Sequence, residues 1–347
     1  MNATPFRVAL TGDFYDSSGQ SRYRNLGVSS LHESPDIVVS KFAEHRPVIT
    51  ADQLQNTDAV IVLTPRVTAE SLAGASDLAI VARFGVGYDT VDVAACTAAD
   101  VLLLITAGAV DRPVAEATVA WMLALTHHVR AKDRLVRESR WNDRSQYMGC
   151  ELRGRTVGLI GFGGIGRETA RLLAGFGMNT PLVYDPFQPQ ENIRAAGATP
   201  VSLDTLLAEA DFVSLHCPLN EHTRGLIGAA QLAKMRPSSY FINTARGGIV
   251  DETALFDALN EHRIAGAAID CFDIEPLTAA PRLAELENVL LAPHCIAWTD
   301  ELFRDIGQTA CRGIMAIRNG ERPRGVINPE VFDRPGFQTK LKRITVQ

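Results

Sequence analysis

Short apolar runs rich in β-branched residues alternate with segments of helical character through the first third of the chain. Gly, Pro and Asp bound these runs, which is typical of strands buried in a parallel sheet that is covered on both faces. The pattern therefore predicts a first α/β unit with strands at Phe6–Leu10, Asp36–Val39, Ala59–Leu63, Leu78–Ala82 and Val101–Ile105.

A different pattern follows from Arg112 to about Arg140. The only Gly or Pro in it is Pro113, which sits where the first turn of a helix tolerates proline. The spacing predicts one long helix. Its first half is apolar nearly all round, so we expect it to be buried on several sides.

The alternation then restarts and predicts a second sheet. Pro181 precedes one of its strands and is expected to be that strand's first residue, because proline cannot donate to a central ladder. Six strands with crossover helices match a doubly wound dinucleotide-binding sheet, and they are expected at Thr156–Ile160, Leu182–Tyr184, Phe212–His216, Tyr240–Asn243, Ala265–Asp270 and Val289–Leu291.

After Trp298 the sequence predicts a helix over about 299–318 and a Pro-containing tail without strands of its own. The tail is expected to pack back on the first unit. The fold class is thus α/β with two doubly wound parallel sheets. We expect residues 1–111 and 299–347 to form one discontinuous domain and residues 112–298 to form the other.

Composition narrows the class of partner. The 347 residues carry 34 basic and 40 acidic side chains, a net charge of −6, and no long run of one sign. We therefore expect no nucleic-acid or membrane partner. Six scattered cysteines without a CxxC pair disfavour a disulfide framework or a metal site. Neither a signal peptide nor a membrane-spanning stretch is recognisable, so a cytoplasmic location is expected.

A glycine-rich turn carries the first chemical signal. Gly161, Gly163 and Gly166 follow a predicted strand and open a predicted helix in the pattern GxGxxG, together with Gly164 and Ile165. Such a turn lets a diphosphate approach backbone N–H groups at the positive end of a helix. Asp185 ends the next strand, where its carboxylate can bind ribose hydroxyls and repel a 2′-phosphate, which favours NAD over NADP.

Three polar residues at strand ends of the second sheet could carry catalysis. Arg246 can clamp a carboxylate and polarise the adjacent carbonyl, His294 can transfer a proton, and Glu275 can orient and charge the imidazole. A structural role for each is the competing interpretation, and spacing alone does not show that they meet. His216 could line the adenine side of a nucleotide site or simply pack in the core.

Four motifs in order give the chain a resemblance to the D-isomer-specific 2-hydroxyacid dehydrogenases over nearly its whole length. They are residues 156–166, residues 243–247 (Asn-Thr-Ala-Arg-Gly), residues 270–276 (Asp-Cys-Phe-Asp-Ile-Glu-Pro), and Pro293-His294. The resemblance implies an NAD domain, a substrate domain made from both chain ends, an active site in the cleft between them, and a homodimer.

The resemblance also implies roles for particular residues. Arg246, Glu275 and His294 become the catalytic residues, and Val86 and Gly87 become the backbone site for the substrate carboxylate. Asp270 is expected to contact the nicotinamide amide, and Thr118 to lie near the nicotinamide. The further cofactor contacts implied are His216, Cys217, Pro218, Thr223, Thr244 and Ala245.

The implied function is NAD-dependent interconversion of a small 2-hydroxy acid and its 2-oxo acid, with glyoxylate or hydroxypyruvate as first substrates. A dinucleotide-sensing corepressor and a phosphite dehydrogenase are the alternatives on this fold.

The sequence departs from the family pattern at two places. Gly164 replaces a frequent Arg or Asn, and bulky Ile296 and Trp298 follow His294. Trp298 is either a pocket wall or a core or interface residue, and Arg83 either contacts substrate or packs on the domain surface.

Overall fold

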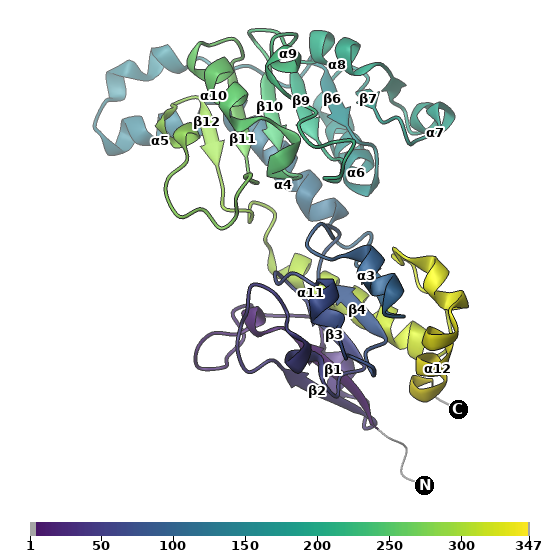
Figure 1. The fold of residues 1–347 in the computed structure, drawn as a ribbon. Coiled ribbons are helices and arrows are strands. Elements are labelled where there is room, and N and C mark those ends of the chain that lie inside the picture. The colour runs from purple at the N-terminus through teal and green to yellow at the C-terminus, as the bar shows by residue number, and fades with distance from the viewer. Residues whose placement is uncertain (1–4, 346–347) are drawn as a thin grey trace. The chain divides into compact units, whose positions relative to one another are not determined.

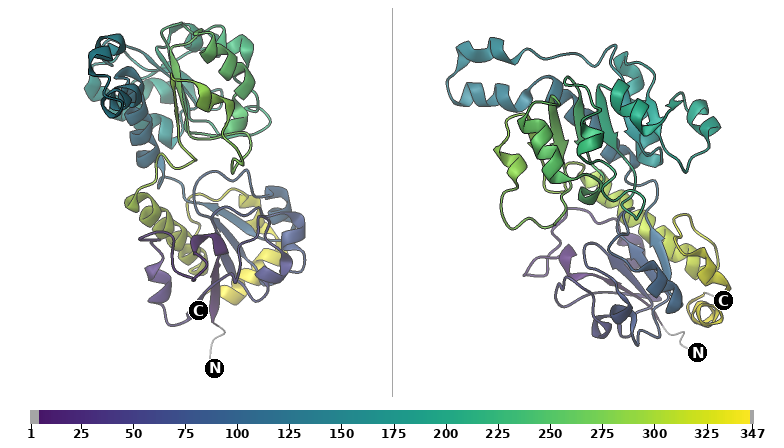
Figure 2. Two further views of the ribbon diagram at one scale, coloured as in Figure 1. Left: turned by 90° about the vertical axis from the view of Figure 1, so that its left-hand side faces the viewer. Right: turned by 45° about the horizontal axis from the view of Figure 1, so that its top comes forward.

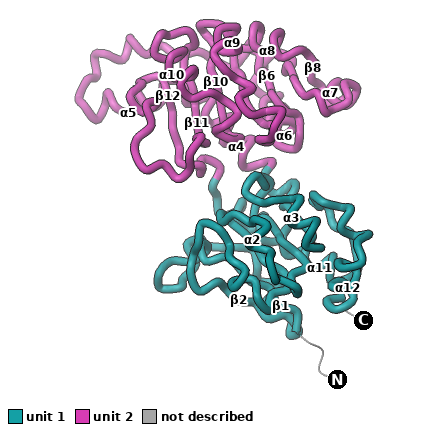
Figure 3. Tube along the Cα trace, in the orientation of Figure 1, with its two compact units in different colours: residues 1–110, 298–347 teal, residues 111–297 magenta. Residues whose placement is uncertain are grey.

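The computed structural model describes residues 5–345 and divides them into two compact units. Residues up to Val110 join residues from Trp298 onward in unit 1, and Asp111–Ala297 form unit 2 (Figure 3). Each unit is built on a parallel sheet (Figure 1), so the predicted fold class is confirmed. No helix within the described residues has the length and apolar composition needed to cross a membrane.

The sheet of unit 1 has five strands in the order β2-β1-β3-β4-β5. Each was predicted to within two residues at either end. Alternate side chains of these strands face opposite sides of the sheet. Most of those on β1, β3, β4 and β5 are buried, whereas the edge strand β2 buries only Ile37. The strands are β1 (Phe6–Leu10), β2 (Ile37–Lys41), β3 (Ala59–Val62), β4 (Ile80–Arg83) and β5 (Leu102–Ile105).

Helices from both ends of the chain complete unit 1. The long α11 (Asp300–Arg318) begins at the N-cap Thr299, whose hydroxyl accepts from the Leu302 N–H, and it packs against β4 and β5 (Figure 2). In the tail, the Asn328 carboxamide oxygen accepts from the N–H of Leu103 at 2.8 Å. The other helices are α1 (Ser29–His32), α2 (Ala69–Leu72), α3 (Val93–Ala98) and α12 (Pro335–Ile344), with 3-10 turns at Gly12–Phe14, Ala51–Leu54 and Pro329–Asp333.

The sheet of unit 2 has seven strands in the order β12-β11-β10-β9-β6-β7-β8. The six predicted strands are all present. Pro181 was expected to be the first residue of its strand, but it lies directly before β7, which begins at Leu182. The sequence missed only the two-residue edge strand β8. The strands are β6 (Val157–Ile160), β7 (Leu182–Tyr184), β8 (Thr199–Pro200), β9 (Phe212–Leu215), β10 (Tyr240–Asn243), β11 (Gly266–Ile269) and β12 (Val289–Leu291).

Two helical layers cover this sheet. One face packs on α4 (Asp111–Thr126) and α6 (Gly164–Leu173), and the other packs on α8 (Leu203–Glu209) and α10 (Glu252–Asn260). The remaining elements are α5 (Val129–Arg137), α7 (Gln190–Ala195), α9 (Ala229–Leu232) and 3-10 turns at Trp141–Tyr147, Ala174–Phe176, Gly247–Ile249 and Arg282–Glu285.

The single long helix predicted from Arg112 is wrong. The structure has two helices, because His128 adopts a left-handed backbone conformation with φ of 51° and ends the first. Neither Gly nor Pro marks the break. Because the sequence contains no helix-breaking residue at this point, its pattern predicts one continuous helix across the break.

Candidate active site

The glycine turn that follows β6 has the geometry of a diphosphate cradle. Gly161 has φ of +95°, and a Cβ on it would lie 2.7 Å from the backbone nitrogen of Cys217. A Cβ on Gly166 would collide with the Gly161 carbonyl, whereas the space beside Gly163 is open. Gly164 and Ile165 begin α6, so their N–H groups lie at the positive end of its dipole. These residues therefore fit the diphosphate of a dinucleotide.

Asp185 holds this turn from the end of β7. Its Oδ2 accepts from the N–H of Phe162 at 2.8 Å, and its Oδ1 accepts from the N–H of Phe187 at 3.0 Å. The predicted ribose-binding carboxylate is thus brought to the glycine turn. Each of its oxygens keeps a second lone pair for a further donor.

The segment after β9 lies against the same turn. His216 is partly buried, its Nε2 lies 2.9 Å from the Ser214 hydroxyl, and the loss of solvent around the ring lowers its pKa to about 4. Burial also raises the pKa of the Cys217 thiol to about 11. The Thr223 hydroxyl donates to the carbonyl of Pro218 at 2.6 Å and folds this loop back on itself. The imidazole of His216 is therefore uncharged at neutral pH.

Thr118 and Thr244, two expected cofactor contacts, lie side by side. Their hydroxyl oxygens are 3.4 Å apart, although one comes from the buried face of α4 and the other follows β10. Next to them, the buried Asn243 organises the turn that carries Arg246. Its carboxamide accepts from the N–H of Ala245 at 3.0 Å and donates to the carbonyl of Arg246 at 2.8 Å.

Asn243 is the functional residue that sequence reasoning missed. Asn243 is the first residue of the Asn-Thr-Ala-Arg-Gly motif, and the sequence alone assigns it no role of its own. Its signal was an Asn at the end of an apolar strand, directly before Thr-Ala-Arg. Asn side chains commonly hydrogen-bond to the backbone two or three residues on, as here.

Backbone packing brings the loops after β10 and β11 together. A Cβ on Gly247, directly after Arg246, would collide with the backbone of Phe272, so only glycine allows this approach. The guanidinium of Arg246 donates to the Ala245 carbonyl at 2.7 Å. Its charge lies near enough to Glu275 to lower the pKa of that carboxyl.

Glu275 and His294 form a hydrogen-bonded pair. Glu275 Oε2 lies 2.7 Å from His294 Nδ1, and Oε1 accepts from the N–H of Phe272 at 2.8 Å. An ionised carboxylate can only accept hydrogen bonds, so Nδ1 of His294 must carry the proton between them. The other ring nitrogen, Nε2, is then available for proton transfer with a substrate. Burial raises the pKa of Glu275, but the hydrogen bond with His294 and the charges of His294 and Arg246 outweigh burial and lower it overall.

Asp270 fixes the backbone that carries the histidine. The N–H of His294 donates to the Asp270 carbonyl at 2.8 Å, and Asp270 Oδ1 accepts from Cys295 and Ile296 at 2.9 and 3.2 Å. These bonds hold His294 at φ of +54°. Burial raises the pKa of Asp270 against the opposing effect of its two N–H donors.

A thiol lies beside this pair. The buried Cys271 lies on the same loop, with its Sγ within 4.8 Å of the ligand atoms of Glu275 and His294. The thiol donates to the carbonyl of Ala245 at 3.3 Å.

The three candidate catalytic residues share one edge of the sheet of unit 2. Arg246, Glu275 and His294 all follow the ends of strands at this edge, which is also the edge that carries the glycine turn.

The expected carboxylate-binding loop belongs to unit 1 and follows β4. Gly85 has φ of +136°, and the guanidinium of Arg83 lies against it, 3.1 Å from the position of an added Cβ. The Gly85 carbonyl accepts from the N–H of Thr106 at 2.9 Å. Val86 and Gly87 are partly exposed.

Trp298 belongs to an aromatic cluster of unit 1. Its ring meets Tyr23 and Phe303 edge-on, at centroid distances of 5.6 and 5.1 Å. The indole is 52% exposed, which excludes a role as a fully buried core residue. It follows His294 by four residues, so their Cα atoms are at most about 14 Å apart.

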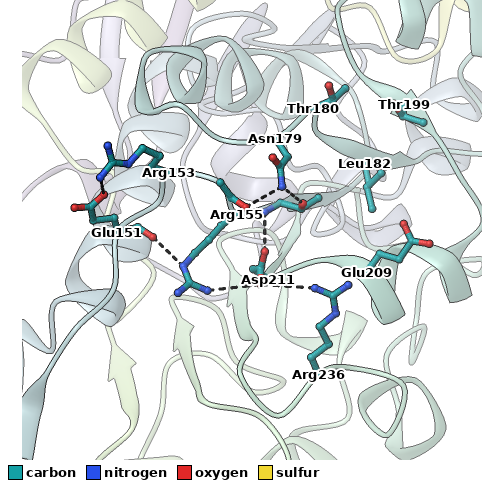
Figure 4. A pocket seen from close by; sticks show the side chains of 12 residues that line it. Glu151, Arg153, Arg155, Asn179, Thr180, Leu182, Thr199, Glu209, Asp211 and Arg236 are labelled. Carbon is teal, nitrogen blue, oxygen red and sulfur yellow. Dashed lines mark hydrogen bonds and ion pairs between the residues drawn. The ribbon is translucent and has the colours of Figure 1, made fainter.

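A hollow of about 860 Å³ opens elsewhere in unit 2, before the first residues of β6, β7 and β9 (Figure 4). This is the edge of the sheet opposite the glycine turn. Asp211 lies between Arg155 and Arg236, at 3.7 and 3.8 Å, and Arg153 pairs with Glu151. Apart from Glu209, the charged side chains that line this hollow are thus paired with one another, and we assign the chemistry to the other edge.

Comparisons with known proteins agree with this geometry. Residues 119–295 match the family model described as "D-isomer specific 2-hydroxyacid dehydrogenase, NAD binding domain". The chain is 36% identical to a glyoxylate reductase of Korarchaeum cryptofilum over 88% of its own length and 97% of that protein. It is also 36% identical to a D-3-phosphoglycerate dehydrogenase of Archaeoglobus fulgidus, over 83% of its own length but only 55% of that protein.

A solved structure supports the same relationship. The crystal structure of a D-lactate dehydrogenase from Aquifex aeolicus, complexed with NAD and lactic acid, is similar with a TM-score of 0.78 at 26% identity. The match covers 90% of this chain and 96% of that one. The chain therefore belongs to the D-isomer specific 2-hydroxyacid dehydrogenase family and is an oxidoreductase with a nicotinamide dinucleotide cofactor.

Proposed function

We propose that this protein interconverts a small D-2-hydroxy acid and its 2-oxo acid with NAD, in the manner of a glyoxylate or hydroxypyruvate reductase. The observation that carries the proposal is the Glu275–His294 pair, 2.7 Å across, beside the charge of Arg246 and on the same sheet edge as the glycine turn. One sheet edge thus offers a proton donor, a carboxylate clamp and a dinucleotide cradle.

Arg246 is the proposed substrate clamp. A guanidinium forms paired hydrogen bonds with a carboxylate and can also polarise the adjacent carbonyl. The hydrogen bonds of Asn243 to the backbone around Arg246 fix the turn from which the side chain projects. We assign the second carboxylate contact to the backbone N–H groups of Val86 and Gly87.

His294 is the proposed acid and base. During reduction, protonated His294 donates from Nε2 to the carbonyl oxygen of the 2-oxo acid, and during oxidation it removes the hydroxyl proton. Glu275 stays ionised, keeps the proton on Nδ1 and stabilises the imidazolium. The bound nicotinamide supplies or accepts the hydride at the substrate carbon.

The cofactor contacts divide into two groups. We assign the diphosphate to the turn of Gly161, Gly163, Gly164, Ile165 and Gly166, and the adenosine side to Asp185, His216, Cys217, Pro218 and Thr223. The nicotinamide side is assigned to Thr118, Thr244, Ala245, Arg246, Asp270 and His294. NAD is preferred to NADP because the Asp185 carboxylate would repel a 2′-phosphate.

We infer that the chain acts as a homodimer. Its α5, the following 3-10 segment and the residue directly after that segment expose apolar side chains that suit burial in an interface. They are Val129, Val136, Trp141 and Met148, at 54%, 63%, 64% and 79% exposure. A second copy of the chain is the proposed partner.

The dimer can be tested by analytical ultracentrifugation. The sedimenting mass should be twice the mass of the chain. The double variant Trp141→Asp with Met148→Asp should shift it to the monomer, and a monomeric wild type would contradict the inference.

We place the protein in the cytoplasm. All six of its cysteines are free, which suits a reducing compartment. Fractionation of the source cells with an antibody to the chain tests this assignment, and recovery in an extracellular or membrane fraction would contradict it.

The test of the activity is consumption of NADH, followed by absorbance, with glyoxylate, hydroxypyruvate, pyruvate and phosphorylated 2-oxo acids as substrates. We expect turnover of at least one unphosphorylated acid and slower turnover with NADPH. A chain that binds NADH but turns over none of these acids would instead favour a dinucleotide-sensing protein.

A further inference from the structure

An acidic side chain stands at the glycine turn. Asp111 is the first residue of α4, and its carboxylate lies in the space that a side chain at position 164 would fill, so that a Cβ on Gly164 would collide with both carboxylate oxygens. Gly164 is the first residue of α6, the helix that opens from the turn. Both helices belong to unit 2 and pack against each other.

The charges around Asp111 leave it without a counterion. In residues 5–345 no hydrogen bond or ion pair is made by its carboxylate. Glu168 faces it from α6 and is itself paired with Arg112 and Arg171. The guanidinium of Arg167 is engaged with the Phe162 carbonyl and Gln188, at 3.0 and 3.3 Å. Burial and the charge of Glu168 raise the pKa of Asp111, while Arg167 opposes them.

The carboxylate of Asp111 matters for cofactor binding because it lies at the N-terminus of α6, where a diphosphate would also bind. The first N–H groups of α6 and the positive end of its dipole favour one anion at this turn. A carboxylate in contact with Gly164 already uses part of that positive potential. A diphosphate bound to the same turn would therefore meet a like charge at close range.

We propose that Asp111 is a resident anion of the dinucleotide site, and that its carboxylate must take up a proton or swing away when the cofactor diphosphate binds. The inference rests on the proposed cofactor site and concerns a residue to which that site assigns no role. Gly164 is the enabling partner, because any side chain there would displace the carboxylate.

Linkage gives the expected pH dependence. A diphosphate beside Asp111 raises the pKa of Asp111 further, so binding takes up protons at pH values between the pKa of the free chain and that of the complex. The dissociation constant then rises by up to about tenfold per pH unit across that interval and is constant above it. Glu168 stays ionised throughout, because its hydrogen bonds with Arg171 and Arg112 lower its pKa.

The test uses ADP-ribose, which carries the adenosine and diphosphate but no nicotinamide, so Glu275 and His294 are not engaged. Its dissociation constant is measured by calorimetry from pH 5.5 to 8 for the wild-type chain, Asp111→Asn and the control Asp133→Asn. Asp133 is an exposed acid on α5 that pairs with Arg137. Titrations at each pH in two buffers that have different ionisation enthalpies and carry no phosphate, so that they do not compete for the glycine turn, report protons taken up.

We expect Asp111→Asn to bind ADP-ribose roughly three- to tenfold more tightly than wild type at pH 8, with the difference narrowing at pH 5.5. Proton uptake should disappear in Asp111→Asn and persist in Asp133→Asn. Equal affinities and equal proton uptake in wild type and Asp111→Asn would overturn the inference while leaving the cofactor site intact. If the wild-type chain bound neither ADP-ribose nor NADH at any pH, the proposed cofactor site would fail as well. An Asp111→Ser variant repeats the test if Asp111→Asn is poorly folded.

Discussion

Glu275 Oε2 lies 2.7 Å from Nδ1 of His294, and the two residues come from loops that follow neighbouring strands, β11 and β12. The pair fixes which ring nitrogen carries the proton and which one faces a substrate. It also gives Glu275 a lowered pKa, so the carboxylate is charged over the whole range in which the enzyme is expected to work.

The first prediction concerns Glu275→Gln. A carboxyl whose pKa is lower in the folded chain contributes stability above its unfolded value of about 4.3, and this contribution is lost as the pH falls through the folded pKa. The melting temperature of Glu275→Gln should therefore fall short of wild type at pH 7, and the gap should close in acid. A gap that is constant from pH 7 to pH 3 would contradict the assigned ionisation.

The same variant should lose activity by less than His294→Asn, for which the loss of proton transfer costs about 10²- to 10⁴-fold in kcat. Both variants should retain the wild-type affinity for NADH. If Glu275→Gln kept the wild-type kcat and pH profile, Glu275 would have no part in positioning the imidazole.

The second prediction separates two roles of Asp185. Asp185→Asn removes the charge and keeps one of the two acceptor oxygens that bind backbone N–H groups, whereas Asp185→Ala removes the charge and both acceptors. We expect Asp185→Asn to narrow the preference for NADH over NADPH by roughly tenfold and to lose one of the two hydrogen bonds to the backbone of the turn. Asp185→Ala should also loosen the turn and weaken both cofactors. An unchanged preference in both variants would remove Asp185 from the ribose site.

The third prediction concerns the buried Asn243. Asn243→Ala leaves the Ala245 N–H and the Arg246 carbonyl without their partner, which should cost about 1–3 kcal/mol of folding free energy. Because the turn that carries Arg246 is then less fixed, KM for the 2-oxo acid should rise while the dissociation constant for NADH stays near that of wild type. A purely structural role predicts a lower melting temperature with KM unchanged.

The fourth prediction concerns Trp298, which contacts Tyr23 and Phe303 yet leaves half of its surface exposed. If the indole limits the space for the substrate side chain, Trp298→Ala should shift kcat/KM toward bulkier 2-oxo acids such as phenylpyruvate, relative to glyoxylate. Val38→Ala, which shortens another half-exposed apolar side chain of unit 1 to which no role is assigned, is the control. An unchanged ratio would leave Trp298 with a packing role alone.

Most of the fold could be predicted from the sequence, because the strands of a parallel sheet are buried on both faces and therefore appear as apolar runs. Val157–Ile160 and Phe212–Leu215 could be recognised in this way, whereas the two-residue edge strand at Thr199 has no such run. The break at His128 was hidden because a single left-handed residue needs neither Gly nor Pro.

For the candidate site, the sequence could identify chemical types at strand ends but not their contacts. That Glu275 meets His294 follows from the order of β11 and β12 and from the tight approach of Gly247 to Phe272. The position of Asp111 against Gly164 depends on the packing of α4 on α6, two helices separated by more than thirty residues of intervening chain. Such pairs are set by tertiary packing, which local patterns do not record.

The most direct test of the central claim is the rate of NADH oxidation with glyoxylate and hydroxypyruvate, compared between the wild-type chain, Arg246→Ala and Arg246→Lys. We predict turnover in the wild type and its near-complete loss in Arg246→Ala. Arg246→Lys should recover it in part, because an ammonium keeps the charge but not the paired hydrogen bonds. NADH should bind all three. Near-wild-type turnover by Arg246→Ala would contradict the proposed active site.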